Sequence, residues 1–269
     1  MKLLVVTPTL GDSPWLTETV ESVARCAAGA RHVLVTRADR VTELAARFPE
    51  AQVVAESGAG MYAAINAGLA GGGDWDAFTY INDDDVLLPG FARVQARVAA
   101  VEREAVMAYG GVRLIDVAGR RLGGIPISAI PGHNRALYAE RLEPVYQHGT
   151  VITRAAWERV GGFDGGLRLC GDTDYLARVC LAGVTGIFVR GEAAAFRLRA
   201  GQLTQNRGAM EAERAAVDMK LGLGAGVGGG RRLCARIGFR AANLHLYAER
   251  VAKYGWKRFD TVIAESAQR

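Results

Sequence analysis

The sequence has few cysteines, few lysines and no long apolar run, and these shortages exclude several classes of protein. Its four cysteines include no C-x-x-C pair, which argues against a disulfide framework and against a structural zinc site. The apolar runs are only as long as strands, so no bilayer-spanning helix is expected. Pro8, Gly11 and Pro14 interrupt the chain where the apolar region of a signal peptide would continue, so we expect a cytoplasmic protein that begins with a β-strand.

Positive charge is concentrated near the C-terminus. Only four of the 33 basic residues are lysines, and the formal net charge is +5. The segment from Arg231 to Arg258 holds eight basic residues and one acidic residue, so the rest of the chain is close to neutral. This distribution favours contact with an anionic membrane, at the inner face of the cytoplasmic membrane, over binding of nucleic acid. A solvated helix face, or packing of the C-terminal helices in a homodimer, stays open as the other interpretation.

The first half of the chain alternates between short apolar runs and segments of helical periodicity. Half of the residues are hydrophobic, as in ordinary globular proteins. The pattern predicts strands over Lys2–Thr7, His32–Val35, Gln52–Ala55 and Ala77–Ile81. It predicts helices from Pro14 to Cys26, over Arg40–Phe48 and Tyr62–Leu69, and from Pro89 to about Ala105. Such alternation indicates an α/β fold with a mostly parallel central sheet flanked by helices.

The second half is less regular. Strands are predicted over Val106–Val112, Val151–Thr153 and Gly186–Val189, and helices over Asp172–Leu181 and Arg231–Tyr254. The segment Ile125–Val145 lacks a clean period, so we expect a long loop of the kind that carries binding residues. Glycines crowd Leu221–Gly230, which predicts a hinge or linker.

An acidic run, Asn82-Asp83-Asp84-Asp85, closes the fourth predicted strand. Adjacent carboxylates repel one another, and a divalent cation such as Mn²⁺ or Mg²⁺ relieves that repulsion because hard cations prefer oxygen ligands. Most acidic runs are merely solvated, but this one precedes an apolar return to the core, and ligands of such sheets bind at the carboxyl ends of the strands. The placement favours a metal and diphosphate site. Neither a P-loop nor a G-x-G-x-x-G follows the first strand.

Two further carboxylates, Asp172 and Asp174, begin a predicted helix. The helix dipole stabilises anions there, and an N-cap with a first-turn acid is the structural interpretation. The functional interpretation is a general base that takes a proton from an attacking hydroxyl group.

Taken in order, these segments resemble family 2 glycosyltransferases of the GT-A fold. Residues 60–68 are similar to the family's G-I-Y-D-A-M-N-K-G helix, and residues 81–90 resemble its L-N-S-D-D-V-L-L-P-G segment, which contains the D-x-D metal motif. His148, with the glycines and aspartate of residues 161–164, resembles the acceptor-side segment, and residues 172–175 match E-D-x-D. Residues 196–204 resemble Y-R-x-H-x-G-S-x-S.

The resemblance implies a Rossmann-like GT-A domain over residues 1–206. The glycine content and the basic helical pattern beyond it predict a helix and glycine-rich linker over 207–230 and a basic helical C-terminal extension over 231–269. The resemblance also implies a metal-dependent transferase that moves a sugar, with inversion, from a nucleotide sugar to a saccharide or lipid-linked acceptor, as in polysaccharide, lipopolysaccharide or glycolipid synthesis. A UDP-sugar is the donor expected first, with Mn²⁺ or Mg²⁺ as the metal.

The same resemblance assigns roles to individual residues. Asp85 is expected to bind the metal, with Asp83 between the metal and the donor, and Asp172 is expected to be the base with Asp174 in support. The residues expected at the donor nucleotide are Thr7, Pro8, Thr9, Asp39, Asn66, Asp83 and Asp84. Those expected at the acceptor or the phosphates are His148, Arg197 and Arg199.

The chain departs from the family pattern at several positions. Thr36 and Arg37 stand where a carboxylate often ends the second strand, Gly171 replaces a Glu beside the base, and Arg199 replaces a His. Two other interpretations therefore stay open: a nucleotidyltransferase, and a sugar- or membrane-binding module that has lost catalysis.

Overall fold

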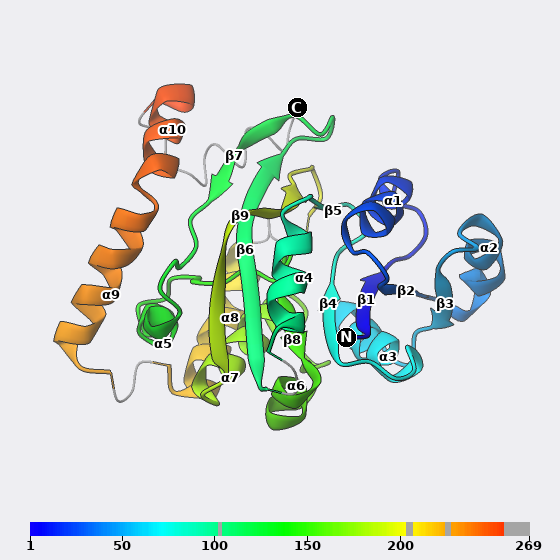
Figure 1. Ribbon diagram of the computed structural model, residues 1–269, viewed down its shortest axis with the longest axis horizontal. Helices are drawn as coiled ribbons and strands as arrows, with labels where there is room; N and C mark the ends of the chain where they lie inside the picture. Colours follow the sequence, from blue (N-terminus) through cyan, green and yellow to red (C-terminus); the bar gives the residue numbers. More distant parts are fainter. Residues whose placement is uncertain (102–103, 203–206, 224–226, 256–269) are drawn as a thin grey trace.

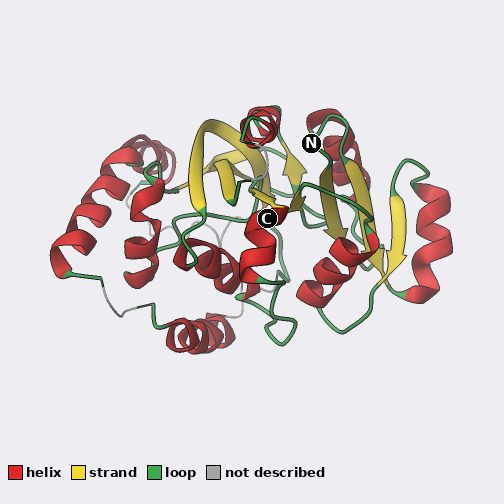
Figure 2. Ribbon diagram, turned by 60° about the horizontal axis from the view of Figure 1, so that its bottom comes forward, coloured by secondary structure: helices red, strands yellow, loops and turns green. Residues whose placement is uncertain are grey.

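A central curled sheet organises the chain, with helices packed on both of its faces (Figures 1 and 2). The computed structural model describes residues 1–101, 104–202, 207–223 and 227–255. The strands are β1 (Leu3–Pro8), β2 (Arg31–Thr36), β3 (Gln52–Ala55), β4 (Ala77–Tyr80), β5 (Val86–Leu87), β6 (Val106–Ile115), β7 (Arg121–Ile125), β8 (Val151–Thr153) and β9 (Thr185–Arg197).

The helices lie between and after these strands. They are α1 (Leu16–Cys26), α2 (Val41–Arg47), α3 (Met61–Gly71), α4 (Phe91–Ala99), α5 (Asn134–Ala139), α6 (Arg154–Val160), α7 (Gly171–Leu181), α8 (Arg207–Leu221), α9 (Gly229–Ala242) and α10 (Leu244–Tyr254). Short 3₁₀ turns cover Ala38–Arg40 and Pro131–His133.

The sheet is parallel in its first half and mixed in its second. Strands β3, β2, β1 and β4 pair in parallel, as the alternating pattern predicts. Beyond β4, the order continues β8, β6, β9 and β5, in which only β6 and β9 are parallel partners, and β7 pairs antiparallel with β6. The predicted α/β class with a helix-flanked central sheet is confirmed, and the antiparallel pairs are an addition to it.

Strand β1 is an apolar run because both of its faces are buried. Leu4 and Val6 enter the core cluster that contains Ile65 of α3, whereas Leu3 and Val5 enter the cluster that contains Phe91 of α4. Successive side chains of a strand point to opposite faces, so a central strand between two helical layers needs apolar residues at every position. The carboxyl end of β1 is thereby fixed next to that of β4.

Three predicted segments before the C-terminal helices differ from the structure. Helix α4 ends at Ala99 rather than near Ala105; residues 102 and 103 lie outside the described ranges. The expected loop Ile125–Val145 contains α5, whose buried face packs against α7 and α9. This helix has only six residues, too few to produce a recognisable helical period in the sequence. Strand β9 is longer than predicted because Gly191, with φ 112°, interrupts its pattern without ending it.

The predicted C-terminal helix is divided at Asn243. The side-chain nitrogen of Asn243 donates to the carbonyl oxygens of Ile127 (2.8 Å) and Phe239 (2.7 Å), and its oxygen accepts from the Ile127 N–H. Helix α9 packs against α5 and α10 against β7. Part of the predicted linker is helical, since α9 begins at Gly229; residues 224–226 and 256–269 lie outside the described ranges. None of the helices within those ranges has the length and apolar composition that a membrane span requires.

Gly90 allows α4 to start directly against β9. A Cβ atom built on Gly90 would overlap the carbonyl oxygen of Glu192, which is backbone and cannot rotate away. We expect Gly90→Ala to lower the free energy of unfolding by about 1–3 kcal/mol because of this overlap. Urea denaturation measures the change. Gly132→Ala is the matched control, since nothing lies within 4 Å of its added Cβ; equal losses in the two variants would contradict this explanation.

Candidate functional site

The carboxyl ends of β1 and β4 open onto a cleft with a volume of about 200 Å³. Pro8 is the last residue of β1, Asp83 and Asp84 follow β4, Asp172 lies at the start of α7, and Arg199 lies in the segment after β9. The remaining lining residues are Met61, Tyr62, Tyr80, Asn82, Gln147, His148, Arg168, Leu169, Phe196 and Gln202. Elements from both halves of the sheet therefore meet at one cleft.

Asp83 and Asp84 line this cleft, and Asp85 does not. The Asp85 carboxylate is fully buried: Oδ1 accepts from the Arg197 backbone N–H at 2.9 Å, and Oδ2 lies 3.1 Å from His148 Nε2 and accepts from the Asn82 amide. Both oxygens of the residue expected to bind the metal are thus engaged by protein groups. Asp85 ties the acidic run to β9 and to the loop that carries His148.

Arg197 lies beneath the acidic run and is only 1% exposed. Its Nε donates to the Asp84 carbonyl oxygen at 2.8 Å, and its Nη2 donates to Glu18 Oε2 at 2.5 Å. Arg197 does not line the cleft. A buried guanidinium needs this many partners, so its role in the structure is to hold the backbone of the run in place.

Arg199 does reach the cleft. Its Nε donates to Asp84 Oδ2 at 2.6 Å, and its guanidinium lies 5.9 Å from the centre of the Trp15 ring. Burial and the neighbouring charge of Asp85 raise the pKa of Asp84, and Arg199 partly offsets both effects. The position where the family pattern has His is therefore occupied by a cation that is paired with the acidic run.

Asp83 has the most accessible carboxylate of the run. The Thr9 hydroxyl donates to Asp83 Oδ2 at 2.6 Å, and the Ser13 hydroxyl donates to the Asp83 carbonyl oxygen at 2.7 Å. Within the described residues, Asp83 Oδ1 has no partner. Burial raises the pKa of Asp83 to about 6 because it disfavours the charged carboxylate. A cation bound beside Asp83 would have the opposite effect and favour the charged form.

Asp172 faces the same cleft from α7. Its Oδ1 accepts from the Tyr62 hydroxyl at 3.3 Å and from the Thr173 N–H at 2.8 Å, and Oδ2 has no partner within the described residues. Burial raises the pKa of Asp172. A Cβ atom at Gly171 would lie 2.5 Å from the Tyr62 ring, which explains why no Glu precedes the aspartate in this chain.

Five other predicted site residues do not line the cleft, although one of them, Thr9, is bonded to Asp83 at its wall. Thr7 is buried and its hydroxyl lies 2.9 Å from His32 Nε2; Asp39 is exposed and bonded to Arg37. Asn66 uses both polar atoms on the backbone of Phe163, and buried Asp174 pairs with Arg178 and Lys220. The polar groups of Thr7, Asn66 and Asp174 connect different elements of the fold, whereas Asp39 is bonded only within its own turn.

Sequence reasoning missed several residues of this region. Gln147, Arg168 and Gln202 line the cleft, and Glu18 neutralises Arg197. The buried side-chain atoms Gln147 Oε1 and His148 Nδ1 have no hydrogen-bond partner among the described residues. Gln147 and His148 are adjacent in the sequence. Two consecutive polar residues before Gly149 and Thr150 were the sequence signal that could have identified Gln147 as a site residue. Unpartnered buried polar atoms that face a cleft are suited to a polar ligand.

The residues that line the cleft fit a divalent cation whose ligands come partly from the protein and partly from a substrate. No group of three or more His, Cys, Asp or Glu side chains within the described residues is arranged to hold a metal ion. Two carboxylates, Asp83 and Asp84, do face the cleft. Such a pair suits Mg²⁺ or Mn²⁺, which are commonly held by one or two carboxylates together with substrate phosphates.

No protein-family model matches the chain, and no curated protein matches it in sequence. Among solved structures, it is similar to the mannosyltransferase PcManGT from Pyrobaculum calidifontis in complex with GDP-Man and Mn²⁺. The TM-score is 0.58 at 14% identity, over 99% of this chain and 79% of the other. The two chains share a mixed α/β fold with a curled central sheet flanked by helices. At this identity the likeness concerns the arrangement of helices and strands and assigns no residue.

Asp83→Asn is expected to raise the melting temperature at neutral pH with a metal chelator present. The pKa of Asp83 in the folded protein, about 6, lies above the value of about 3.9 for an unfolded aspartate, so the folded state binds this proton more tightly. The carboxylate therefore contributes a loss of stability as the pH rises from about 4 to about 6. The gain from the substitution should be near zero at about pH 3 and constant above about pH 7, as followed by circular dichroism.

Asp39→Asn is the matched control. A hydrogen bond with Arg37 lowers the pKa of Asp39, so removing its charge should not stabilise the protein at any pH. A rise in melting temperature that is the same for both variants would contradict the environment described for Asp83.

Proposed function

We propose that the protein is a metal-dependent glycosyltransferase that uses a nucleoside diphosphate sugar as donor. One observation carries the proposal: two carboxylates that face the cleft, Asp83 and Asp84, share it with a third carboxylate, Asp172, from a different element. A transferase of this kind needs one set of carboxylates to hold a cation that neutralises the departing diphosphate, and another carboxylate to activate the acceptor. The shared fold with a mannosyltransferase supports this interpretation.

Asp83 and Asp84 would hold the divalent cation, which when bound neutralises charge that develops on the leaving diphosphate. Arg199, bonded to Asp84, adds a positive group at the same wall. We assign Asp85 a positioning role, because its two oxygens are already bonded to His148, Arg197 and Asn82. Thr9 orients Asp83 through its hydroxyl group.

Asp172 would act as the general base. Tyr62 and the first turn of α7 hold Oδ1, which leaves Oδ2 for the acceptor hydroxyl. As the acceptor oxygen attacks the anomeric carbon, the bond between that carbon and the diphosphate oxygen breaks and Asp172 takes the acceptor proton. The products are the glycosylated acceptor and the nucleoside diphosphate, and attack opposite the leaving group inverts the anomeric configuration.

The donor and the acceptor are proposed only by class. The UDP-sugar expected from the sequence gains no support from the similar structure, which contains GDP-Man. A lipid-linked acceptor is favoured by the exposed apolar residues of the basic C-terminal helices, since Leu233, Ile237 and Leu244 are each more than half exposed between arginines. Basic helices with exposed apolar residues are suited to anionic lipid surfaces.

The proposal predicts a specific loss in Asp172→Asn. With Mn²⁺ and a panel of nucleoside diphosphate sugars, the variant should lose about 10²–10⁴-fold in kcat because the acceptor proton has no base, while the affinity for the nucleoside diphosphate is retained. Release of nucleoside diphosphate measures turnover, and calorimetry measures binding. Asp74→Asn, an exposed carboxylate bonded to Lys2 at the opposite end of the sheet, is the matched control.

Two results would contradict the proposal. One is the absence of turnover of every donor with either Mn²⁺ or Mg²⁺, which would favour a binding module. The other is turnover that Asp172→Asn reduces no more than the control substitution does.

A further inference from the structure

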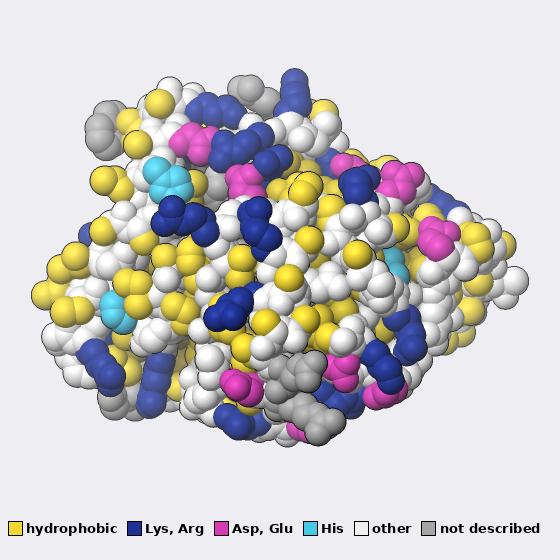
Figure 3. Space-filling model, viewed as in Figure 1, with side chains coloured by type: hydrophobic (Ala, Val, Ile, Leu, Met, Phe, Trp, Pro, Cys, Tyr) yellow, Lys and Arg dark blue, Asp and Glu magenta, His cyan; other side chains and the backbone are white. Residues whose placement is uncertain are grey.

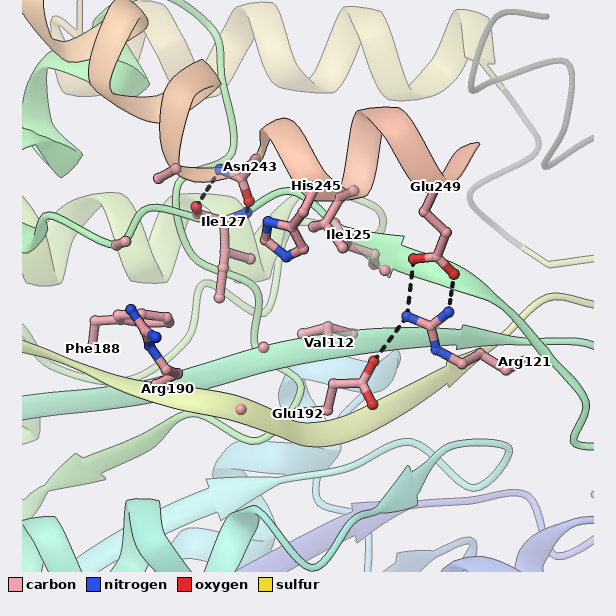
Figure 4. A pocket seen from close by; sticks show the side chains of 16 residues that line it. Val112, Arg121, Ile125, Ile127, Phe188, Arg190, Glu192, Asn243, His245 and Glu249 are labelled. Atoms are coloured by element: carbon pink, nitrogen blue, oxygen red, sulfur yellow. Dashed lines mark hydrogen bonds and ion pairs between the residues drawn. The ribbon is translucent and has the colours of Figure 1, made fainter. Parts of the chain in front are cut away.

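A second and larger cavity, of about 550 Å³, lies between α10 and the strands β6, β7 and β9 (Figure 4). This volume is within the range of ligand-binding pockets in proteins. The cavity shares no lining residue with the cleft that contains the acidic run. Nothing in the proposed chemistry accounts for it.

The walls of this cavity are mostly apolar. Val112 comes from β6, Ile125 and Ile127 from β7 and the segment after it, Phe188 from β9, and Leu246 from α10. Asn243 keeps the α9–α10 junction bonded to the Ile127 backbone, so the wall on the helix side is fixed. Apolar walls of this extent favour a ligand with a hydrocarbon portion.

The charges at the rim are unevenly paired. Arg121 forms ion pairs with Glu192 and Glu249 at one end of the cavity, and Arg113 also pairs with Glu192. Both carboxylates of the rim are therefore neutralised. Figure 4 shows Arg190 on the β9 side and His245 on the α10 side, away from those ion pairs. Within the part of the chain that the structure describes, neither side chain makes an ion pair.

We propose that this cavity binds an anionic amphiphile, with its hydrocarbon chain against the apolar walls and its phosphate at Arg190 and His245. A guanidinium forms strong, charge-assisted hydrogen bonds with phosphate oxygens, and the apolar walls gain from removing a hydrocarbon chain from water. The two parts of the cavity match the two parts of such a molecule.

The surroundings of the cavity suit a lipid. On the face shown in Figure 3, apolar side chains are spread widely, including over the side of the C-terminal helices, with basic side chains among them. The exposed apolar residues near this end include Ile130, Leu233, Ile237 and Leu244. Exposed apolar residues among basic ones are suited to a bilayer surface, from which one lipid molecule could enter the cavity.

Along the sheet, the cavity also lies close to the cleft that contains the acidic run. Strand β9 supplies Arg190 and Glu192 to the cavity and Phe196 to the cleft. At about 3.3 Å per residue, Glu192 and Phe196 are roughly 13 Å apart along the strand. Phe196 packs against the cluster that contains Val112 and Ile125, both of which line the cavity.

Calorimetric titration of the full chain with dodecyl phosphate, in the absence of nucleotide sugar, tests the proposal. We expect saturable binding that Arg190→Gln weakens at least about tenfold through loss of the charged contact. Ala129→Trp and Ala242→Trp, which fill the cavity from two different walls, should weaken it to a similar degree. Arg97→Gln, an exposed arginine of α4, is the matched control and should bind as the wild type does.

The proposal would be overturned by an absence of saturable binding, or by affinities in Arg190→Gln and the folded tryptophan variants that equal the wild-type value. It would also be overturned if inorganic phosphate bound as tightly as dodecyl phosphate, since the apolar walls would then contribute nothing. The proposal is independent of the proposed function, because no donor is present; Asp83→Asn should bind dodecyl phosphate normally.

Competition distinguishes the two sources of such a ligand. Neutral phosphatidylcholine vesicles are supplied with either an isoprenyl phosphate or an anionic diacyl phospholipid. Displacement of dodecyl phosphate by the isoprenyl phosphate alone assigns the cavity to a lipid-linked substrate. Displacement by both assigns it to membrane lipid in general, and displacement by neither overturns the lipid assignment.

Discussion

The structure depends on how it accommodates three consecutive aspartates at the end of β4, two of which, Asp84 and Asp85, are buried. Without compensating partners, two adjacent buried carboxylates beside a third would destabilise the fold strongly. Compensation comes from the distant end of β9: the Arg197 backbone bonds Asp85, the Arg197 side chain bonds the Asp84 backbone, and Arg199 pairs with Asp84. The same contacts join the parallel half of the sheet to its mixed half and leave Asp83 facing the cleft.

This arrangement separates residues that build the site from residues that could act in it. Asp85, Arg197 and Asp174 are buried and fully engaged, so they determine position. Asp83 and Asp172 each keep one carboxylate oxygen without a partner within the described residues, and each has a pKa raised by burial. Carboxylates of this kind are suited to a cation or a proton, which is the electrostatic basis of the proposed reaction.

Much of the fold followed from the sequence because local patterns determine it. The apolar runs of β1 and β4, and the polar residues that follow them, predict a parallel sheet with an acidic strand end. The contacts between distant segments were not predictable: Glu18 pairs with Arg197 across 179 positions, and Asn66 bonds the Phe163 backbone. Asp172 faces the cleft, whereas Asp174, two residues later, is buried in ion pairs. Sequence spacing alone cannot distinguish these two environments.

The most direct test of the account is the location of manganese in crystals grown with Mn²⁺ and a nucleoside diphosphate. Anomalous diffraction identifies the ion without reference to the protein density. The account predicts a manganese peak in contact with the carboxylates of Asp83 and Asp84, in the cleft that Asp172 shares. A bound nucleotide with no manganese in that cleft, or manganese bound only at a different place, would contradict it.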